Sequence, residues 1–367
     1  MVMVLHFYQG GGFAGFHLSE RCLRLSILGG TGVDLFFVLS GFLITRILIA
    51  TRRDLGYFRN FYVRRLLRIV PLYYAFLVLY YFALPLFDHR AIVGFNKTWW
   101  YWVYLQNIPD TFPGFEAVGP IHYWSLAVEE HFYLFWPLLV YCLPPHRLAR
   151  VSACLALRAL AVRFALLRYT SADVFYFTLC RMDALAFGTL LACLEAGGEL
   201  ERWRTRFLVL LGCLAPLLLF VWTQASGEGA MLVQLLKYSA VGLIYLAVLG
   251  LTVIHQHSRI VASVFANRPL RLTGKISYGL YVYHTTCFGY LLHYVSAKRH
   301  PFPCFLACFA GTFTVSWLSY MLFEARFLRL KRLFSYESST PLNQIGANGR
   351  AIRLAVQQTR PTPRLND

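Results

Sequence analysis

Long apolar runs alternate along this chain with short polar segments. Between Gly32 and Ala50 only Asp34 and Arg46 are charged, and the run over residues 27–50 meets the roughly 20 residues that a helix needs to cross a bilayer core. Further runs that predict spanning helices lie at residues 66–87, 121–143, 148–167, 176–194, 207–222, 231–254, 276–295 and 302–323. The apolar opening of the chain is too short to span by itself, so we expect a further segment before it and ten crossings in all.

An arginine cluster follows the run that ends at Ala50, with six arginines in the 17 positions from Arg52 to Arg68. Short loops that are rich in Lys and Arg remain in the cytoplasm. The segments that this rule places inside hold about three times as many of these residues as the segments outside. We therefore predict that both chain ends, the arginine cluster and residues 259–275 are cytoplasmic, and that residues 227–229 lie outside.

Three regions depart from a simple spanning pattern. The helix predicted over residues 66–87 holds Pro71 in its first turns, where a missing N–H is best tolerated. Residues 88–120 combine a short aromatic stretch with many turn formers, which favours an interfacial or re-entrant segment. Residues 335–367 are polar and rich in helix breakers, so we predict a flexible cytoplasmic tail after a membrane domain over residues 1–334.

Composition agrees with an all-α protein that is a bundle of transmembrane helices. Of the 367 residues 58% are hydrophobic, 17% aromatic and only 14% charged, which predicts an integral membrane protein. We expect its membrane to be of the bacterial inner type. The net charge of +18 is explained by cytoplasmic loops, so no nucleic-acid partner is expected. The nine cysteines lack the spacing of zinc ligands, and no metal is expected.

Ionisable residues inside the apolar runs are the candidates for function. Each costs roughly 2.5–3.5 kcal/mol near the middle of a spanning helix, so such residues are seldom kept without a purpose. His6 has no other charge nearby and is interpreted as a base or an acyl carrier, because imidazole exchanges protons near neutral pH. His284 is interpreted equally well as a packing residue. Glu324 belongs to the same set of candidates.

Two local pairs of charges have different interpretations. Glu129 and Glu130 point about 100° apart on a helix, and we expect Glu129 to face the interior together with Trp124 and Ser125. Arg181 and Asp183 are too close in sequence to face each other, so each is expected to pair with another helix. Packing between helices is the favoured explanation of that second pair, ahead of a catalytic role.

The arginine cluster contains a pattern suited to phosphate. Arg65 and Arg68 are three residues apart and therefore share one face of a helix. Guanidinium groups bind phosphate through paired hydrogen bonds, so together with Arg64 they form a candidate anion site. Membrane topology alone would also explain these cations.

Five sequence strings resemble the acyltransferase 3 family of integral membrane O-acyltransferases over residues 1–330. They are GVDLFFVLSGFLIT, FYVRRLLRIVPLYY, WSLAVEEHFYLFWPLL, RMDALAFGTLLA and KISYGLYVYHT. The resemblance implies a ten-helix enzyme that takes an acyl group, usually acetyl, from cytoplasmic acyl-CoA and delivers it to a hydroxyl of an extracytoplasmic glycan. It also implies that His6 is the catalytic histidine, Arg65 and Arg68 are the Arg-x-x-Arg pair, and Glu129 is the acid of the Trp-Ser-Leu motif.

The chain departs from the family pattern at both ends. The family has an arginine eleven positions before the histidine, which we expect in a segment upstream of Met1. Near Glu324 the chain lacks the proline that usually follows. With no fused esterase-like domain expected, a second transfer step would need a separate partner or direct delivery.

The expected mechanism places acyl-CoA on Arg64, Arg65 and Arg68, with its thioester directed toward His6. Asp34 and Glu129 are expected to orient the His6 imidazole or to balance its charge. Other polar or aromatic residues are expected to support the site: Ser40, Trp124, Ser125, Arg181, Asp183, His284 and Glu324. Acyl-CoA is a co-substrate in this reading, and no bound cofactor is expected.

Two other classes of protein remain open on the sequence. A transporter or flippase of lipid-linked glycans would also need many helices and buried charges, although no paired halves with broken helices are visible. A non-catalytic relative that binds partners is the second alternative. In either case the bilayer is a partner, and the oligomeric state is left open.

Overall fold

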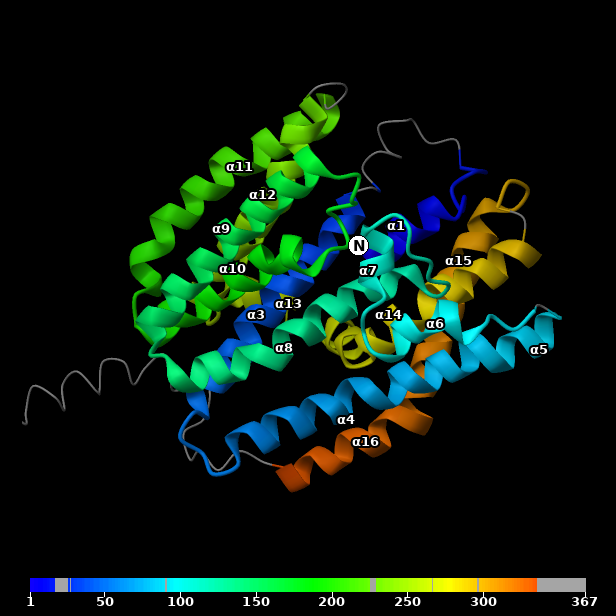
Figure 1. Cartoon of the computed structure of the whole chain (residues 1–367), viewed down its shortest axis with the longest axis horizontal. Helices are drawn as coiled ribbons and strands as arrows, with labels where there is room; N and C mark the ends of the chain where they lie inside the picture. The colour runs from blue at the N-terminus through cyan, green and yellow to red at the C-terminus, as the bar shows by residue number, and fades with distance from the viewer. Residues whose placement is uncertain are drawn as a thin grey trace, which may run out of the picture.

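The structure is a computed structural model that describes residues 1–16, 26, 28–89, 91–224, 229–265, 267–295 and 297–334. These residues form helices joined by turns and loops, and no strand occurs among them. The predicted tail over residues 335–367, and residues 227 and 228 of the segment predicted outside, lie beyond the described part of the chain. The all-helical class is therefore as the sequence predicts (Figure 1).

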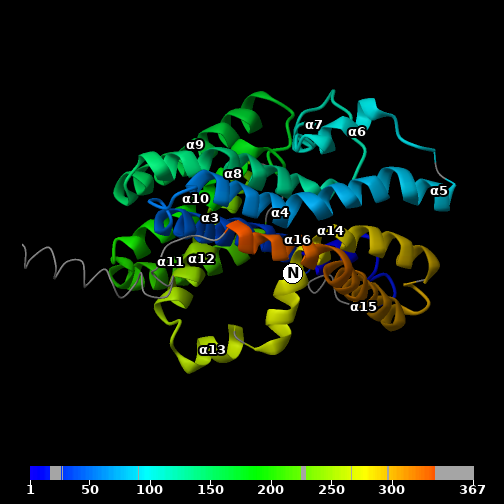
Figure 2. The ribbon, with the colours of Figure 1, turned by 90° about the horizontal axis from the view of Figure 1, so that it is seen from below.

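The helices follow the apolar runs closely, except that α4 and α14 begin eight or nine residues before the predicted runs at 66–87 and 276–295. Their bounds are α1 Val2–Gln9, α3 Gly32–Ala50, α4 Tyr57–Val78, α5 Leu84–Asp88, α6 Phe95–Trp102, α7 Asn107–Thr111, α8 Trp124–Cys142, α9 Pro145–Tyr169, α10 Thr178–Ala196, α11 Arg204–Gln224, α12 Gly229–Ile254, α13 Arg259–Phe265, α14 Arg268–Tyr294, α15 Pro301–Ser319 and α16 Ala325–Leu330. A π-helical turn, Leu79–Ala83, joins α4 to α5 without a break. In Figure 2, α13 lies apart from the other helices and links α12 to α14.

Four helical segments among the described residues are long and apolar enough to cross a bilayer. They are Leu28–Ala50, Tyr57–Asp88, Met231–Ile254 and Pro301–Phe334. Helices such as α8 and α10 are not among these four segments, because their ionisable residues lower their apolar character. Several of these ionisable side chains are buried inside the protein, so their charge is not exposed. The ten crossings and the cytoplasmic chain ends stay predictions.

The predicted start of α4 was wrong. The helix begins at Tyr57 rather than at residue 66, directly after Gly56, whose φ of 77° marks a left-handed residue outside the helix. Pro71 consequently lies inside the helix and not in its first turns. Apolarity alone missed the first two turns, because there arginines alternate with buried residues such as Tyr57 and Phe61. The last four arginines of the cluster, from Arg59 to Arg68, therefore lie on α4, whereas the first two, Arg52 and Arg53, lie in the turn before it.

Cysteine labelling tests the predicted orientation of this arginine-bearing region. A Leu55→Cys variant places a thiol on a side chain that is 79% exposed, just before α4. We expect a membrane-impermeant maleimide added to intact cells to modify Glu228→Cys and to leave Leu55→Cys unmodified until the cells are permeabilised. The parent chain, whose native cysteines are kept, supplies the background. If Leu55→Cys were labelled in intact cells and Glu228→Cys were not, the predicted topology would be wrong and the true orientation would be the reverse.

Helix α3 packs directly on α10 and is the centre of the fold (Figure 1). Gly41 on α3 and Gly188 on α10 approach the backbone of the facing helix so closely that a Cβ at either would overlap a carbonyl oxygen. Small residues at such crossings let helix backbones come together in membranes.

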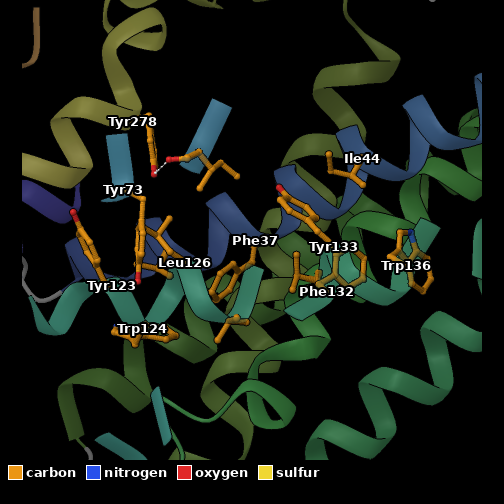
Figure 3. Packing of buried hydrophobic residues seen from close by; sticks show 14 of the residues in the cluster. Phe37, Ile44, Tyr73, Tyr123, Trp124, Leu126, Phe132, Tyr133, Trp136 and Tyr278 are labelled. Carbon is orange, nitrogen blue, oxygen red and sulfur yellow. Dashed lines mark hydrogen bonds between the residues drawn. The ribbon is translucent and has the colours of Figure 1, made fainter. Parts of the chain in front are cut away.

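An aromatic core joins α3 to α4, α8 and α14. Figure 3 shows some of its members, including Phe37, Tyr73, Tyr123 and Trp124, packed close together. The Tyr278 hydroxyl of α14 donates a hydrogen bond of 2.9 Å to the carbonyl oxygen of Ile69 in α4. This core fixes the relative positions of the four helices that surround the candidate site.

Candidate active site

Two histidines from opposite ends of the chain are in direct contact. His6 Nδ1 of α1 lies 2.6 Å from His284 Nε2 of α14, and the planes of the two rings are 17° apart, with their centroids separated by 4.9 Å. The neighbouring Phe7 is fully buried and packs edge-on against Phe288 and Phe305, which anchors α1 to α14 and α15. Packing of the Phe7 side chain thus positions the residue that precedes it, His6. Of the two readings of His284, a role beside His6 is the one that this contact supports.

A third imidazole, which the sequence analysis missed, touches this pair. His122 lies just before α8, and its ring centroid is 4.9 Å from that of His284 and 6.0 Å from that of His6. Its Nδ1 is 3.1 Å from the Thr285 hydroxyl, while its buried Nε2 has no hydrogen-bond partner among the described residues. No arrangement of His, Cys, Asp and Glu in the described part of the chain could hold a metal ion. The signal in the sequence was a histidine at the start of an apolar run.

A hydroxyl pair connects the histidines to the first turn of α8. The Tyr281 hydroxyl donates a short hydrogen bond to the carbonyl oxygen of His122. The Tyr281 oxygen is also 2.5 Å from the Ser125 hydroxyl, which therefore donates to it. Ser125 and Tyr281 both line a cavity that lies beside the histidine group.

The cavity has a volume of about 450 Å³ and extends along α8 from Ser125 to the arginines of α4. Ser125, Glu129 and Tyr133 line it at intervals of four residues, and the Arg65 guanidinium lies over the Tyr133 ring, 5.2 Å from its centroid. Eight residues of helix separate Ser125 from Tyr133, a rise of about 12 Å. The wall is otherwise largely apolar, and its polar members besides those already named are Ser40, Arg68, Ser277 and Tyr278.

Val2 brings α1 to the edge of this cavity. Val2 lines the cavity, and His6 follows it by four residues, which places both on one face of α1. The cavity is thus lined by the serine of the Trp-Ser-Leu segment and by both arginines of the Arg-x-x-Arg pair, whereas His6 does not line it and lies one turn of α1 beyond Val2.

Glu129 lines the cavity, whereas Glu130 does not. The buried Glu129 carboxylate accepts hydrogen bonds from the Ser40 hydroxyl, at 2.6 Å, and from the Tyr133 hydroxyl. The expectation that Glu129 orients His6 was wrong for this structure, because its carboxylate is turned toward Tyr133, one turn further along α8. Glu129 instead lies between the arginines and the histidines.

Asp34 also does not contact His6, contrary to expectation. Its carboxylate accepts a hydrogen bond of 2.5 Å from Arg181 of α10, and both side chains are buried. Asp183 in turn pairs at 2.6 Å with Arg163 of α9, which was not among the predicted residues. Ser239 of α12 hydrogen-bonds to both partners of this second pair. The prediction that Arg181 and Asp183 would each pair with another helix is in agreement with these contacts.

The buried Asp34–Arg181 pair should be required for stability. Removing one partner of a buried ion pair leaves an unpaired charge and costs about 3–5 kcal/mol. We expect Asp34→Ala to lower the thermal unfolding midpoint of the detergent-solubilised chain strongly. The double variant Asp34→Ala/Arg181→Met removes both charges and should recover part of the loss. A double variant that is less stable than Asp34→Ala would show that the unpaired charge of Arg181 does not cause the loss of stability.

The other predicted residues lie outside the cavity. Arg64 Nη1 donates to the carbonyl oxygens of Lys331 and Phe334, at 3.0 and 3.2 Å, so the expectation that it joins the anion site was wrong. Glu324 is buried in the π-helical turn after α15 and accepts a long hydrogen bond of 3.5 Å from Ser319. The Trp124 ring lies 5.6 Å from the Arg181 guanidinium and helps to enclose that charge.

A family model and several curated relatives point to the same protein family. A family model described as an acyltransferase domain, acyltransferase 3, matches residues 1–321. The chain is 31% identical over 283 residues to peptidoglycan O-acetyltransferase OatA of Listeria monocytogenes, covering 70% of this chain and 44% of that protein. It is also 31% identical over 292 residues to Putative peptidoglycan O-acetyltransferase YrhL of Bacillus subtilis, with the same two shares.

A third relative is a Putative O-acetyltransferase of Staphylococcus aureus, 24% identical over 335 residues, or 85% of this chain and 54% of that protein. The chain thus spans about half the length of the curated relatives that it matches. No solved structure matches the chain.

Proposed function

We propose that this chain, which belongs to the acyltransferase 3 family, moves an acyl group, most simply acetyl, from cytoplasmic acyl-CoA to a hydroxyl of an extracytoplasmic glycan. The observation that carries the proposal is the cavity that has two arginines near one end and, at the other, Tyr281, which packs against His122 and His284. In the proposal, this cavity holds the acyl group between the cytoplasmic donor, which is charged and does not cross the membrane, and the histidine group.

The arginine end suits the donor. Coenzyme A carries several phosphate charges, and guanidinium groups bind phosphate through charge-assisted hydrogen bonds. Arg65 is held over the Tyr133 ring, and no hydrogen bond to Arg65 or Arg68 is formed among the described residues. Their N–H groups therefore remain available to an anion. The extended, uncharged part of acyl-CoA that carries the thioester would then lie along α8, in the apolar part of the cavity.

The histidine end suits the chemistry. In the proposed step the acceptor oxygen attacks the thioester carbonyl carbon while His6 takes the hydroxyl proton. The C–S bond then breaks, and the coenzyme leaves as a thiolate that receives this proton from the His6 imidazolium. In the alternative, the imidazole first accepts the acyl group itself and passes it to the hydroxyl in a second step.

The acceptor class is proposed from the relatives. The proteins of Listeria and Bacillus that resemble this chain are named as peptidoglycan O-acetyltransferases, so we propose a cell-wall glycan hydroxyl as acceptor.

Thiol release tests the proposed function. The full chain, purified in detergent, is mixed with acetyl-CoA and soluble cell-wall glycan fragments, and free coenzyme thiol is measured together with glycan-bound acetyl. We expect thiol release at a rate that depends on the fragments, and acetyl ester on the fragments if delivery is direct. Absence of thiol release with every short-chain acyl-CoA tested would overturn the proposal.

A further inference from the structure

We propose that His284 is a positioning residue that fixes the tautomer of His6, so that His6 presents a bare Nε2 to the reacting groups. This inference rests on the proposed function for its catalytic meaning, but the tautomer itself can be observed without turnover. It goes beyond contact between two histidines, because it assigns a hydrogen or a lone pair to each ring nitrogen.

The assignment starts from the backbone of α14. His284 Nδ1 lies 2.8 Å from the carbonyl oxygen of Tyr281 and 3.0 Å from that of Leu280. Carbonyl oxygens only accept hydrogen bonds, so Nδ1 must carry the hydrogen. A neutral imidazole has one N–H, and the other nitrogen is an acceptor. His284 Nε2 is therefore an acceptor as long as the ring is neutral.

The neutral form of His284 follows from its surroundings. Its side chain is fully buried, and no carboxylate among the described residues bonds to it or to His6. The two acidic groups expected near the site are engaged elsewhere, Asp34 with Arg181 and Glu129 with Ser40 and Tyr133. A buried charge without a partner is disfavoured by several kcal/mol, so the ring stays neutral.

A single hydrogen bond between the two rings then determines the tautomer of His6. His6 Nδ1 is 2.6 Å from the acceptor His284 Nε2, so His6 Nδ1 carries the hydrogen and donates it. The second nitrogen of a neutral His6, Nε2, is then left with its lone pair. That nitrogen is the one that can take a hydroxyl proton or an acyl group. In Ser-His-Asp enzymes a carboxylate performs the same orienting task, and the wrong tautomer there abolishes most of the rate.

Two substitutions of His284 separate positioning from packing. In His284→Gln the amide oxygen can occupy the place of Nε2 and still accept from His6 Nδ1. In His284→Asn the amide nitrogen takes the place of Nδ1, keeps the bond to the backbone carbonyls, and leaves His6 without an acceptor. The two variants have similar size and polarity, so a packing role would affect both alike.

We expect His284→Gln to keep kcat within about tenfold of the unmodified chain, because the acceptor remains. His284→Asn should lower kcat by about a hundredfold or more, as the wrong tautomer of a base does, while the KM for acetyl-CoA changes by only a few-fold. Equal losses in the two variants, or an unimpaired His284→Asn, would overturn the assignment.

Nitrogen NMR of the full chain with ¹⁵N-labelled histidine reads the tautomer directly. The His6 signals are identified by their absence in His6→Gln, and Nε2 of His6 should show the shift of a bare nitrogen, with Nδ1 protonated. A protonated Nε2 in the unmodified chain overturns the inference. Since this spectrum needs no acceptor and no donor, it decides the tautomer even if acetyl transfer is never detected, an outcome that would instead contradict the proposed function.

Discussion

Replacing His6 with glutamine should abolish acyl transfer at every donor concentration while acyl-CoA binding stays within a few-fold. A base or acyl carrier acts in the transition state, so its loss lowers kcat and cannot be offset by more donor. Glutamine keeps a polar group of similar length without a titratable nitrogen. The measurements are acyl-CoA binding and glycan acetylation by the full chain.

The matched control is His146→Gln, at an exposed histidine in the first turn of α9, away from the cavity. It makes the same chemical change and should leave both quantities unchanged. Acetylation by His6→Gln at the unmodified rate would reduce His6 to a packing residue and remove the proposed mechanism.

Arg65→Ala or Arg68→Ala should instead weaken donor binding. Each substitution removes charge-assisted hydrogen bonds worth roughly 1.5–3 kcal/mol, so acyl-CoA affinity should fall by about one to two decades. High donor concentration should restore part of the turnover, because the chemistry at His6 is unaffected. Titration of acyl-CoA against each purified variant measures the effect.

The neighbouring Arg64 supplies the control for these two arginines. Arg64 belongs to the same helix, but it does not line the cavity and hydrogen-bonds to carbonyl oxygens near residue 334. We expect Arg64→Ala to bind acyl-CoA nearly as well as the unmodified chain. If Arg64→Ala weakened binding as much as Arg65→Ala, a general loss of positive charge would explain the data better than a specific site.

The helices themselves were largely predictable from the sequence, because apolar length is a local property. The predicted runs at residues 121–143 and 231–254 correspond to α8 with its preceding turn and to α12. The start of α4 was not predictable in this way, since its first turns owe their helical form to buried aromatic residues between arginines. An amphipathic turn next to a spanning run is easily read as a loop.

The partners within the site were less predictable than its members. His6 and His284 are 278 positions apart, and nothing local in the sequence states that they meet. Asp34 was assigned to His6 by analogy with the carboxylate of a catalytic triad, but in the structure it pairs with Arg181 of α10. Asp183, which lies on α10 two residues after Arg181, pairs with Arg163 of α9. In the sequence nothing distinguishes Arg163 from the other arginines of α9, so this pairing could not be predicted.

The central claim is that an acyl group supplied at the arginine end reaches a hydroxyl at the opposite face. Sealed inverted membrane vesicles that contain the full chain test this claim most directly. Labelled acetyl-CoA is added outside the vesicles. Cell-wall glycan fragments, and any separate delivery partner, are trapped in the lumen. The account predicts labelled acetyl on the lumenal glycan with the unmodified chain and none with His6→Gln. Labelling that occurs only when donor and glycan share one side of the membrane would contradict it.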